Sequence, residues 1–251
     1  MSERTSLSVI VPAYNEAARI VPGLERISEY CIGRFDPFEI IVVDDGSSDD
    51  TADIVASLQH RMPQVRLLRL RRNQGKGVSV RAGMLSASPA SDYLLMCDAD
   101  LSTAIEEIEK LIPWVVSGGV DVAFGSRALR ESRISVRQPV YREAMGKIFG
   151  FLAGMFVVPG IRDPQCGFKL FSGQSAREIF QRTRINRFAF DVEALFLARK
   201  FGYSIKEVAV SWSNSPFSRV RILRDSLIMA GDIFRIRYYA LTKQYEKPYR
   251  G

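Results

Sequence analysis

The sequence has little histidine, few cysteines and no long apolar run. A single histidine, His60, in 251 residues almost removes histidine-based triads and histidine-ligated metals from the possible chemistries. Three widely spaced cysteines (Cys31, Cys97 and Cys166) favour reduced thiols in a cytosolic protein over a disulfide framework or a zinc site. No run approaches the roughly 20 apolar residues that cross a bilayer, and the first residues lack a signal-peptide pattern. The chemistry must therefore rest on carboxylates, lysine, arginine or a bound metal.

Basic residues exceed acidic ones, and most of the excess lies near the C-terminus. The chain has 35 Lys and Arg against 28 Asp and Glu, a formal net charge of +7, of which +5 falls between Arg219 and Gly251. Such an excess indicates an anionic partner: phosphate, nucleic acid or the acidic face of a bilayer. We expect no nucleic acid, because the sequence has no recognised module and no strand platform with interleaved aromatic and basic residues.

The first half of the chain alternates between strand and helix patterns. The expected strands are residues 7–11, 39–44, 65–70, 92–97 and 120–125, separated by helical spacing over 16–30, 51–61, 77–87 and 104–116. Near-continuous apolar strands separated by helices are typical of a parallel sheet covered on both faces, so we expect an α/β fold. In such sheets, ligands bind beyond the carboxyl ends of the strands.

The second half is less regular. Helices are expected over residues 141–158, 191–201 and 222–241, and strands after the loop DPQCG and over 204–212. The chain has no internal repeat, low-complexity segment or linker. We therefore expect a single domain over residues 1–251.

Two carboxylates one residue apart form the strongest local signal. Asp98 and Asp100 follow an apolar strand in the sequence MCDAD. At a strand end such a pair can share a divalent cation, with Asp100 turned toward the metal and Asp98 toward the ligand. Hard oxygen ligands with few protein contacts suit Mg²⁺ or Mn²⁺. A helix-capping turn is the alternative, since Asp and Ser also favour that position.

Two further acidic loops should reach the same edge of the sheet. PAYNE follows the first expected strand and DDGSSDD follows the second. Crowded carboxylates repel one another and lose hydration, which usually indicates a compensating metal or ligand. We therefore prefer a shared site over three unrelated helix caps.

The motifs, in this order and spacing, resemble glycosyltransferase family 2. In the first half they are SVIVPAYNE, IVVDDGSSDDT, RNQGKG, DADLS and GSR. In the second half, DPQCGFKLF, RFAFDVEALFLARKFGY, EVAVSW and SRVRILRDSLIM are similar to the dolichyl-phosphate β-glucosyltransferase branch, close to the dolichol-phosphate mannose synthases. The resemblance implies a GT-A fold: a Rossmann-like, mainly parallel sheet flanked by helices, with C-terminal amphipathic helices. It also implies a nucleotide-sugar-binding half (1–127) and an acceptor-binding half (128–251).

The resemblance assigns donor-binding and metal-binding residues by their positions in these motifs. The donor-binding positions are Pro12, Tyr14, Glu16, Val43, Asp45, Asp98 and Ala99. The first three match the loop that holds the base and ribose, and Asp45 matches the carboxylate that reads uracil or guanine. Asp100 matches the ligand of Mg²⁺ or Mn²⁺. Ser102 falls where mannose synthases often supply a second ligand through an amide oxygen, which a hydroxyl replaces less well.

The acceptor implied by the resemblance is a dolichyl or other polyprenyl phosphate. This group is ionised near neutral pH, so it needs orientation more than deprotonation. Arginine suits that task through bidentate contact with phosphate. Arg127 in GSR matches an arginine that meets the acceptor phosphate in the family. Arg137, Arg142 and Arg219 are further candidates, and a solvated surface charge is the alternative for each of the four.

Four other charged residues have alternative interpretations. Asp163 matches an aspartate near the sugar that has been considered as a base; we favour sugar or acceptor positioning for it, with a turn aspartate as the alternative. Asp191 and Glu193 are expected to cap or open a helix. Lys76 either contacts the diphosphate or lies on the surface. The candidate catalytic residues are Asp100, Arg127 and Asp163.

Two segments could bring the chain to a membrane surface. Residues 148–158 (IFGFLAGMFVV) are too short to cross a bilayer but long enough to dip into it, and the basic segment 222–239 has the composition of an interfacial helix. Each cation near an anionic leaflet contributes on the order of 1 kcal/mol. We expect a protein bound peripherally to the cytoplasmic face of a membrane. The alternative is that both helices complete the core.

The sequence therefore predicts an inverting, metal-dependent transferase that moves a hexose, foremost glucose from UDP-glucose, to dolichyl or polyprenyl phosphate. The alternatives are a GDP-mannose-dependent synthase, a family 2 transferase with a different acceptor, and a non-catalytic protein that binds sugar nucleotides or membranes. A processive polysaccharide synthase is disfavoured, because no Gln-x-x-Arg-Trp motif is present. Hydride transfer is excluded, because no G-x-G-x-x-G follows a strand.

Overall fold

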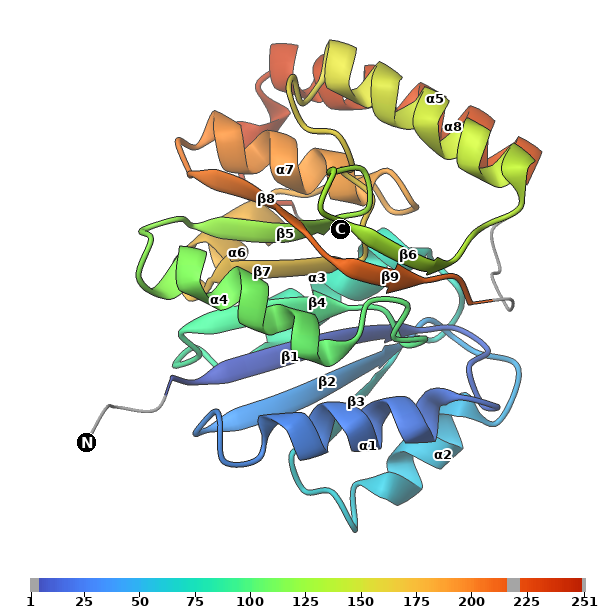
Figure 1. Cartoon of the computed structure of the whole chain (residues 1–251), viewed down its shortest axis with the longest axis vertical. Helices are drawn as coiled ribbons and strands as arrows, with labels where there is room; N and C mark the ends of the chain where they lie inside the picture. Colours follow the sequence, from blue (N-terminus) through green and yellow to red (C-terminus); the bar gives the residue numbers. More distant parts are fainter. Residues whose placement is uncertain (1–4, 216–221, 250–251) are drawn as a thin grey trace.

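The computed structural model describes residues 5–215 and 222–249 of the chain (Figure 1). Its centre is a seven-stranded sheet in the order β3-β2-β1-β4-β7-β5-β8. The strands are β1 (Leu7–Ala13), β2 (Phe38–Asp44), β3 (Val65–Arg69), β4 (Tyr93–Cys97), β5 (Val122–Ser126), β7 (Phe168–Ser172) and β8 (Ile205–Ala209). In this sheet β7 runs antiparallel to its neighbours β4 and β5, and the other pairs are parallel. The mainly parallel α/β sheet predicted from the sequence is confirmed.

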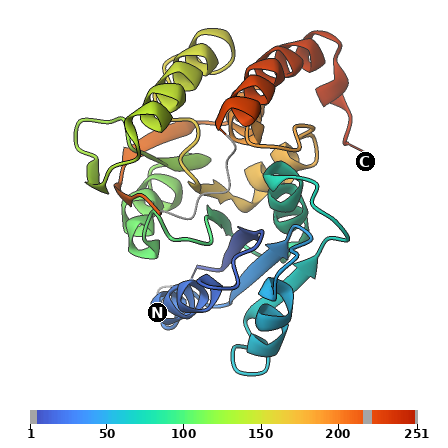
Figure 2. The same cartoon turned by 90° about the vertical axis from the view of Figure 1, so that its right-hand side faces the viewer.

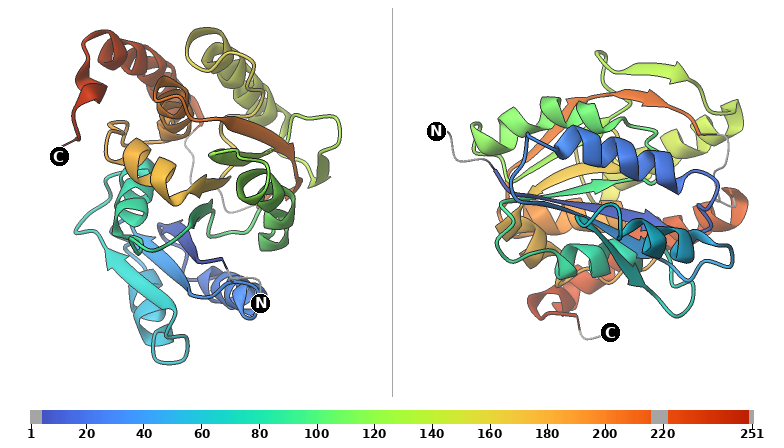
Figure 3. Two further views of the ribbon diagram at one scale, coloured as in Figure 1. Left: turned by 90° about the vertical axis from the view of Figure 1, so that its left-hand side faces the viewer. Right: turned by 90° about the horizontal axis from the view of Figure 1, so that it is seen from below.

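Helices cover both faces of the sheet (Figures 2 and 3). One core lies under α1 (Ile20–Cys31), α2 (Thr51–Leu58) and α4 (Ile108–Val116), the last preceded by the 3₁₀ turn η1 (Ile105–Glu107). The other core lies under α3 (Lys76–Ser86), α5 (Val140–Phe156), α6 (Gly173–Phe180), α7 (Phe190–Lys200) and α8 (Ile222–Leu241). A second 3₁₀ turn, η2 (Gln244–Glu246), follows α8.

The continuous apolar pattern of the strands follows from this double covering. Successive side chains of a strand point to opposite faces. In β1, Ile10 joins the core under α3, whereas Val9 and Val11 join the core under α1. All three side chains are fully buried. Alternating apolar and polar residues would therefore place polar side chains in one of the two cores.

The structure differs from the sequence-based expectations at some boundaries and in the small elements. The first helix begins at Ile20 instead of residue 16, because residues 14–19 form a turn in which Asn15 has a φ of 55°. The expected strand 204–212 is divided between β8 and β9 (Ser211–Ser213). β9 pairs with β6 (Arg133–Val136) in a separate two-stranded parallel sheet. No apolar run marks these short strands, because their side chains are mostly exposed.

α5 and α8 lie side by side at one end of the molecule, and both are amphipathic (Figure 1). The rings of Phe156 and Phe234 join them, with centroids 6.0 Å apart. Each helix exposes apolar side chains at three- and four-residue spacing, which are Tyr141, Ile148, Phe151 and Met155 on α5 and Leu227, Phe234, Tyr238 and Leu241 on α8. In the described part of the chain, no helix has both the length and the apolar character needed to cross a membrane.

Gly83 marks a close approach of α3 to the sheet. A methyl group here would lie 2.5 Å from Ile10 Cγ2 and 3.0 Å from Val43 Cγ2. We expect Gly83→Ala to lower the free energy of unfolding by about 1–2 kcal/mol, because overpacking outweighs the gain in helix propensity. Urea unfolding measures the change. The control is Gly231→Ala in α8, where nothing lies within 4 Å of the added methyl and stability should hold or rise. Equal effects of the two substitutions would contradict this packing.

Candidate active site

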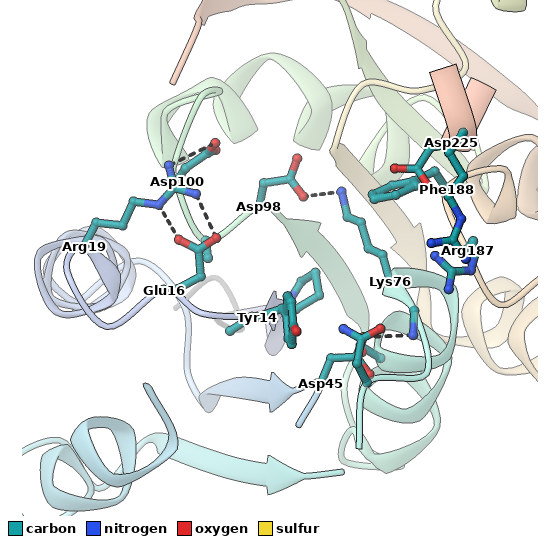
Figure 4. A pocket seen from close by; sticks show the side chains of 17 residues that line it. Tyr14, Glu16, Arg19, Asp45, Lys76, Asp98, Asp100, Arg187, Phe188 and Asp225 are labelled. Carbon is teal, nitrogen blue, oxygen red and sulfur yellow. Dashed lines mark hydrogen bonds and ion pairs between the residues drawn. The ribbon is translucent and has the colours of Figure 1, made fainter. Parts of the chain in front are cut away.

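A cavity of about 470 Å³ lies beyond the carboxyl ends of β1, β2 and β4 (Figure 4). We call it the donor cavity. The loops after parallel strands meet at one edge of a sheet, so all three acidic loops reach it. The predicted residues that line it are Pro12, Tyr14, Glu16, Asp45, Asp98, Ala99 and Asp100. Val43, also predicted to bind the donor, is not among the lining residues and is buried in the core under α3.

Asp45 holds the glycine loop that forms one wall of the donor cavity. Its Oδ1 accepts a hydrogen bond from the Gln74 N–H and its Oδ2 accepts one from the Gly75 N–H, both at 2.8 Å. Gly75 has a φ of +107°, a conformation that side-chain-bearing residues rarely adopt. Burial raises the pKa of Asp45, although these two N–H donors oppose the rise. Each carboxylate oxygen keeps a second lone pair, so the group can still accept from a ligand.

Lys76 and Asp98 form an ion pair across the floor of the donor cavity. Lys76 Nζ lies 2.5 Å from Asp98 Oδ1, and Figure 4 shows the lysine reaching from the start of α3 toward the aspartate. Burial alone would lower the pKa of Lys76, but the charges of Asp98 and Asp191 raise it above its ordinary value. Lys76 is therefore a permanent cation inside this cavity. The surface alternative considered for this lysine does not describe its position.

The carboxylate of Asp98 also rests against the backbone at Gly167. A methyl group at Gly167 would lie only 1.9 Å from Asp98 Oδ2. Glycine leaves room here for the Asp98 carboxylate in its present position, and its φ is not in the left-handed region. This contact joins the loop before β7 to the donor cavity.

Arg19 brings Glu16 and Asp100 together on the other side of the donor cavity. Its Nη2 donates to Glu16 Oε1 at 2.8 Å, and its Nη1 lies 3.7 Å from Asp100 Oδ2. The hydrogen bond to Glu16 is the main reason why the pKa of Arg19 is raised. Asp100 Oδ1 accepts from the backbone N–H of Ser102 at 3.0 Å. The metal contact of the Ser102 hydroxyl stays a prediction.

A buried ion pair lies beneath the donor cavity. Lys169 Nζ is 2.6 Å from Asp191 Oδ1, and both side chains are at most 4% exposed. Burial raises the pKa of Asp191, and the charges of Lys169 and Lys76 oppose the rise. Asp98, Lys76, Asp191 and Lys169 thus alternate in charge from the cavity into the core. Asp191 does not line the cavity, so its place is that of a support.

Glu193 holds a loop that the sequence motifs did not single out. Its carboxylate accepts from the N–H groups of Arg184 and Ile185 and from the Tyr245 hydroxyl, at 2.7–2.9 Å. Burial raises its pKa to about 7. The loop that follows supplies Arg187 and Phe188 to the donor cavity.

Several lining residues of the donor cavity were missed by sequence reasoning. They are Arg19, Asn73, Gly75, Ser79, Arg187, Phe188, Arg224 and Asp225. Asn73 and Gly75 belong to the quoted motif RNQGKG, so their spacing could have suggested them. Arg187 and Phe188 begin the quoted motif RFAFDVEALFLARKFGY, and Arg224 and Asp225 lie in SRVRILRDSLIM, but these motifs alone do not place them beside the strand ends.

A second cavity, of about 150 Å³, is lined by four cations, by Trp212 of β9 and by the carboxylates of Glu143 and Asp163. We call it the basic cavity, and its lining cations are Arg127, Arg137, Lys147 and Arg162. The guanidinium carbon of Arg127 lies 5.4 Å from the centroid of the Trp212 ring. Such a cavity can bind a dianionic group such as a phosphate monoester.

Asp163 forms a bidentate ion pair with Arg127 at the edge of the basic cavity. Arg127 donates from its backbone N at 2.8 Å and from Nε and Nη2 at 2.7 Å to the two carboxylate oxygens. Burial would raise the pKa of Asp163, but the charge and hydrogen bonds of Arg127 hold it below its ordinary value. A carboxylate so paired is a poor proton acceptor at neutral pH. The geometry makes Asp163 the residue that orients Arg127. The Nη1 of Arg127 takes no part in these hydrogen bonds to Asp163.

The other predicted phosphate-binding arginines are divided. Arg137 lines the basic cavity. Arg142 stands in the first turn of α5 but does not line that cavity, and its buried Nε has no hydrogen-bond partner. Arg219 lies outside the described residues.

Asp98 and Asp100 are the carboxylates that could hold a divalent cation. Within the described ranges, no three side chains of His, Cys, Asp or Glu come together as a protein-only metal site. Two carboxylates are nevertheless enough for Mg²⁺ or Mn²⁺ when water and ligand phosphates supply the remaining oxygens. The donor set therefore fits such an ion.

Comparison with known protein families identifies the chain. The profile described as Glycosyl transferase family 2 matches residues 8–180. The chain belongs to this family. Sugar transfer is therefore its class of reaction, as the motifs predicted.

Characterised relatives extend the match beyond the family profile. The chain is 38% identical over 243 residues to a dolichyl-phosphate beta-glucosyltransferase of Dictyostelium discoideum, covering 92% of this chain and 74% of that protein. It is 36% identical to the human protein of the same description, covering 96% of this chain and 78% of that protein. The resemblance to this branch of the family is confirmed.

Solved structures share the fold. Mannosyl-3-phosphoglycerate synthase from Rubrobacter xylanophilus matches 96% of this chain and 74% of its own, with a TM-score of 0.68 at 20% identity. Glucosyl-3-phosphoglycerate synthase from Mycobacterium tuberculosis, crystallised with Mn²⁺ and UDP-glucose, matches 100% of this chain and 82% of its own, with a TM-score of 0.66 at 20% identity. The predicted GT-A type of fold is confirmed.

The Asp163–Arg127 pair predicts a stability that depends on pH. Because the folded pKa of Asp163 is lowered, the stabilisation is complete above its unfolded pKa of about 4 and is lost as the pH falls through the lower folded pKa. Arg127→Gln leaves a buried carboxylate without its cation, so we expect a loss of about 3 kcal/mol near neutral pH. The loss should shrink toward about pH 4, where Asp163 becomes protonated in the variant.

Urea unfolding near pH 7 and near pH 4 measures this difference. The control is Arg137→Gln, which removes a cation from the same cavity without touching Asp163 and should cause a small change at both pH values. A loss for Arg127→Gln that has the same size at both pH values would refute the assignment.

Proposed function

We propose that this chain transfers glucose from UDP-glucose to dolichyl or a related polyprenyl phosphate, with inversion at the anomeric carbon. The observation that carries the proposal is the similarity, over more than nine-tenths of the chain, to proteins described as dolichyl-phosphate beta-glucosyltransferases. The two cavities give the proposal a physical form. The donor cavity offers carboxylates and a lysine to a nucleotide sugar, and the basic cavity offers arginines to a phosphate.

Residues 1–127 supply most of the donor-binding side chains in this proposal, and Arg187, Phe188, Arg224 and Asp225 of the second half complete the lining of the donor cavity. Tyr14 and Asp45 lie where the nucleoside part of the donor enters, and Lys76 neutralises charge on the diphosphate. Asp98 and Asp100 would hold a Mg²⁺ or Mn²⁺ ion, which would supply Lewis-acid stabilisation to the leaving diphosphate. The glucosyl-3-phosphoglycerate synthase with Mn²⁺ and UDP-glucose supports a divalent ion in this fold.

Residues 128–251, together with Arg127, form the acceptor side. The acceptor phosphate oxygen attacks the anomeric carbon as the bond from that carbon to the diphosphate breaks, so UDP leaves and the sugar is inverted. The phosphate is already ionised, so no side chain has to remove a proton from it. Arg127 and Arg137 orient it, and Asp163 fixes Arg127 in place.

A lipid-borne acceptor requires contact with a membrane. The apolar stripes of α5 and α8 provide a surface for this contact, since both helices lie at the same end of the molecule (Figure 1). Arg237 lies beside the stripes and attracts anionic headgroups. We place the chain at the cytoplasmic face, where nucleotide sugars and reduced thiols occur together.

Transfer of labelled sugar into an organic-extractable lipid tests the proposal. We expect label from UDP-glucose, but not from GDP-mannose, to enter a polyprenyl phosphate in the presence of Mg²⁺ or Mn²⁺, and EDTA to abolish the transfer. Equal transfer from GDP-mannose would overturn the donor assignment. Donor binding without any lipid label would indicate a different acceptor or a non-catalytic protein.

Asp100→Ala tests the metal assignment. We expect the substitution to lower turnover at least about 1,000-fold, because charge on the leaving diphosphate is no longer neutralised. Binding of Mn²⁺ in the presence of UDP, followed by electron paramagnetic resonance, should be lost as well. Circular dichroism and urea unfolding should show an intact fold. Asp53→Ala is the control, since this aspartate is exposed on α2, pairs with Arg69 and does not line the donor cavity. Unchanged Mn²⁺ binding by Asp100→Ala would rule out this ligand.

A further inference from the structure

A third hollow lies at the far ends of the paired helices. It has a volume of about 400 Å³ and lies where α5, α7 and α8 end. We call it the distal groove. Its cations are Arg199, Lys200 and Arg237, and its apolar lining includes Val157, Phe196 and Leu241. It shares no lining residue with the donor cavity or the basic cavity.

The three cations of the distal groove have no counter-ion among the residues that the structure describes. None of its lining residues is acidic, and none of the three forms an ion pair within 4 Å with another described residue. Neighbouring surface cations such as Arg182 and Arg235 do pair with a carboxylate. Like charges that line one hollow repel one another, so the groove is ready to accept an anion.

Helix-end effects explain only part of this cluster. Arg199 and Lys200 stand in the last turn of α7, where cations interact favourably with the helix dipole. Arg237, however, comes from α8 and converges on the same groove. Arg199 Nη1 donates to the Pro159 carbonyl at 2.6 Å, which holds this guanidinium at the rim.

The distal groove and the basic cavity stand at opposite ends of the apolar stripes. Gly146 and Lys147, in the first half of α5, line the basic cavity, whereas Val157, which caps the same helix, lines the distal groove. From Lys147 to Val157 the helix rises about 15 Å. Leu241, the last exposed residue of the α8 stripe, also lines the distal groove. Apolar surface is thus continuous with the cationic hollow.

We infer that the distal groove binds the phosphate headgroup of an anionic membrane lipid that is not a substrate. The inference rests on the proposed membrane contact of α5 and α8 and extends it with a specific site. The apolar lining takes the first part of the acyl region, and the three cations take the phosphate. With a lipid phosphate at each end of the stripes, the chain lies on the membrane in one orientation, with the basic cavity at headgroup level.

The charge of the distal groove selects this occupant over a second copy of the chain. A symmetric dimer formed through this end would bring the same cationic groove close to its own copy, and like charges at an interface oppose association. A free phosphate ion would use the cations but not the adjoining apolar surface.

Vesicle binding by the whole chain tests the inference. The variant Lys200→Gln/Arg237→Gln removes two groove cations and keeps the Arg199 contact with Pro159. The control, Arg61→Gln/Arg69→Gln, removes two exposed cations, one shortly after α2 and one at the end of β3. These two elements lie at the opposite end of the molecule from α5 and α8 (Figure 1). Co-sedimentation is measured with phosphatidylcholine vesicles that contain or lack phosphatidylglycerol. We expect the groove variant to bind the phosphatidylglycerol vesicles about 10- to 30-fold more weakly than the control does.

Equal binding by the two variants would overturn the distal groove as a lipid site. Competition by inorganic phosphate at constant ionic strength provides a second arm: displacement from vesicles at low millimolar phosphate would assign the groove to free anions. Sedimentation of the vesicle-free protein as a dimer that is lost in the groove variant would assign it to a second copy.

Transfer to a short-chain prenyl phosphate in detergent separates this inference from the proposed function. The groove variant should keep its turnover there, because neither substituted residue lines the donor cavity or the basic cavity. If the unmodified chain transfers no sugar but vesicle binding depends on the groove, the proposed function fails and the lipid site stands. If the unmodified chain transfers sugar but vesicle binding does not depend on the groove cations, the lipid site fails and the proposed function stands.

Discussion

The ion pair between Lys76 and Asp98 is the interaction on which the architecture of the site depends. Parallel strands end at a common edge, so three acidic loops meet in one place and their charges must be balanced. Lys76 does so for Asp98, and Arg19 does so for Asp100. Asp45 receives backbone N–H groups of the glycine loop instead. The same loop leads into α3, whose first residue is Lys76, and so places Lys76 in the cavity. The shape of the donor site and its charge balance therefore depend on the same loop.

Sequence patterns predicted the parts of this site that are local. Asp98 and Asp100 follow an apolar strand, and the strand itself is readable because both faces are buried. Residues that reach the cavity from distant elements were not predictable, because nothing near Asp225 on α8 indicates that this helix returns to the strand ends. Exposed β6 and β9 carry no apolar signal. The orienting role of Asp163 depends on its three hydrogen bonds from Arg127, which only the fold reveals.

Access to the donor cavity separates the charged residues that can contact a ligand from those that only support the site. Asp191 and Lys169 are almost completely buried, pair with each other and do not line the cavity. Glu193 is also buried, and its oxygens accept hydrogen bonds from the loop that leads to Arg187. Asp45 is equally buried, yet it lines the donor cavity and stays within reach of a ligand. Contact with the cavity, and not position along the chain, therefore distinguishes the two groups.

The loop from Asp163 to Gly167 touches both cavities within five residues. At one end Asp163 binds Arg127 of the basic cavity, and at the other Gly167 lies close to the carboxylate of Asp98 in the donor cavity. Five residues therefore link the position of Asp98 to that of Arg127. The spacing between the donor cavity and the basic cavity is thus set by one short loop of a single sheet, and not by the relative placement of two domains.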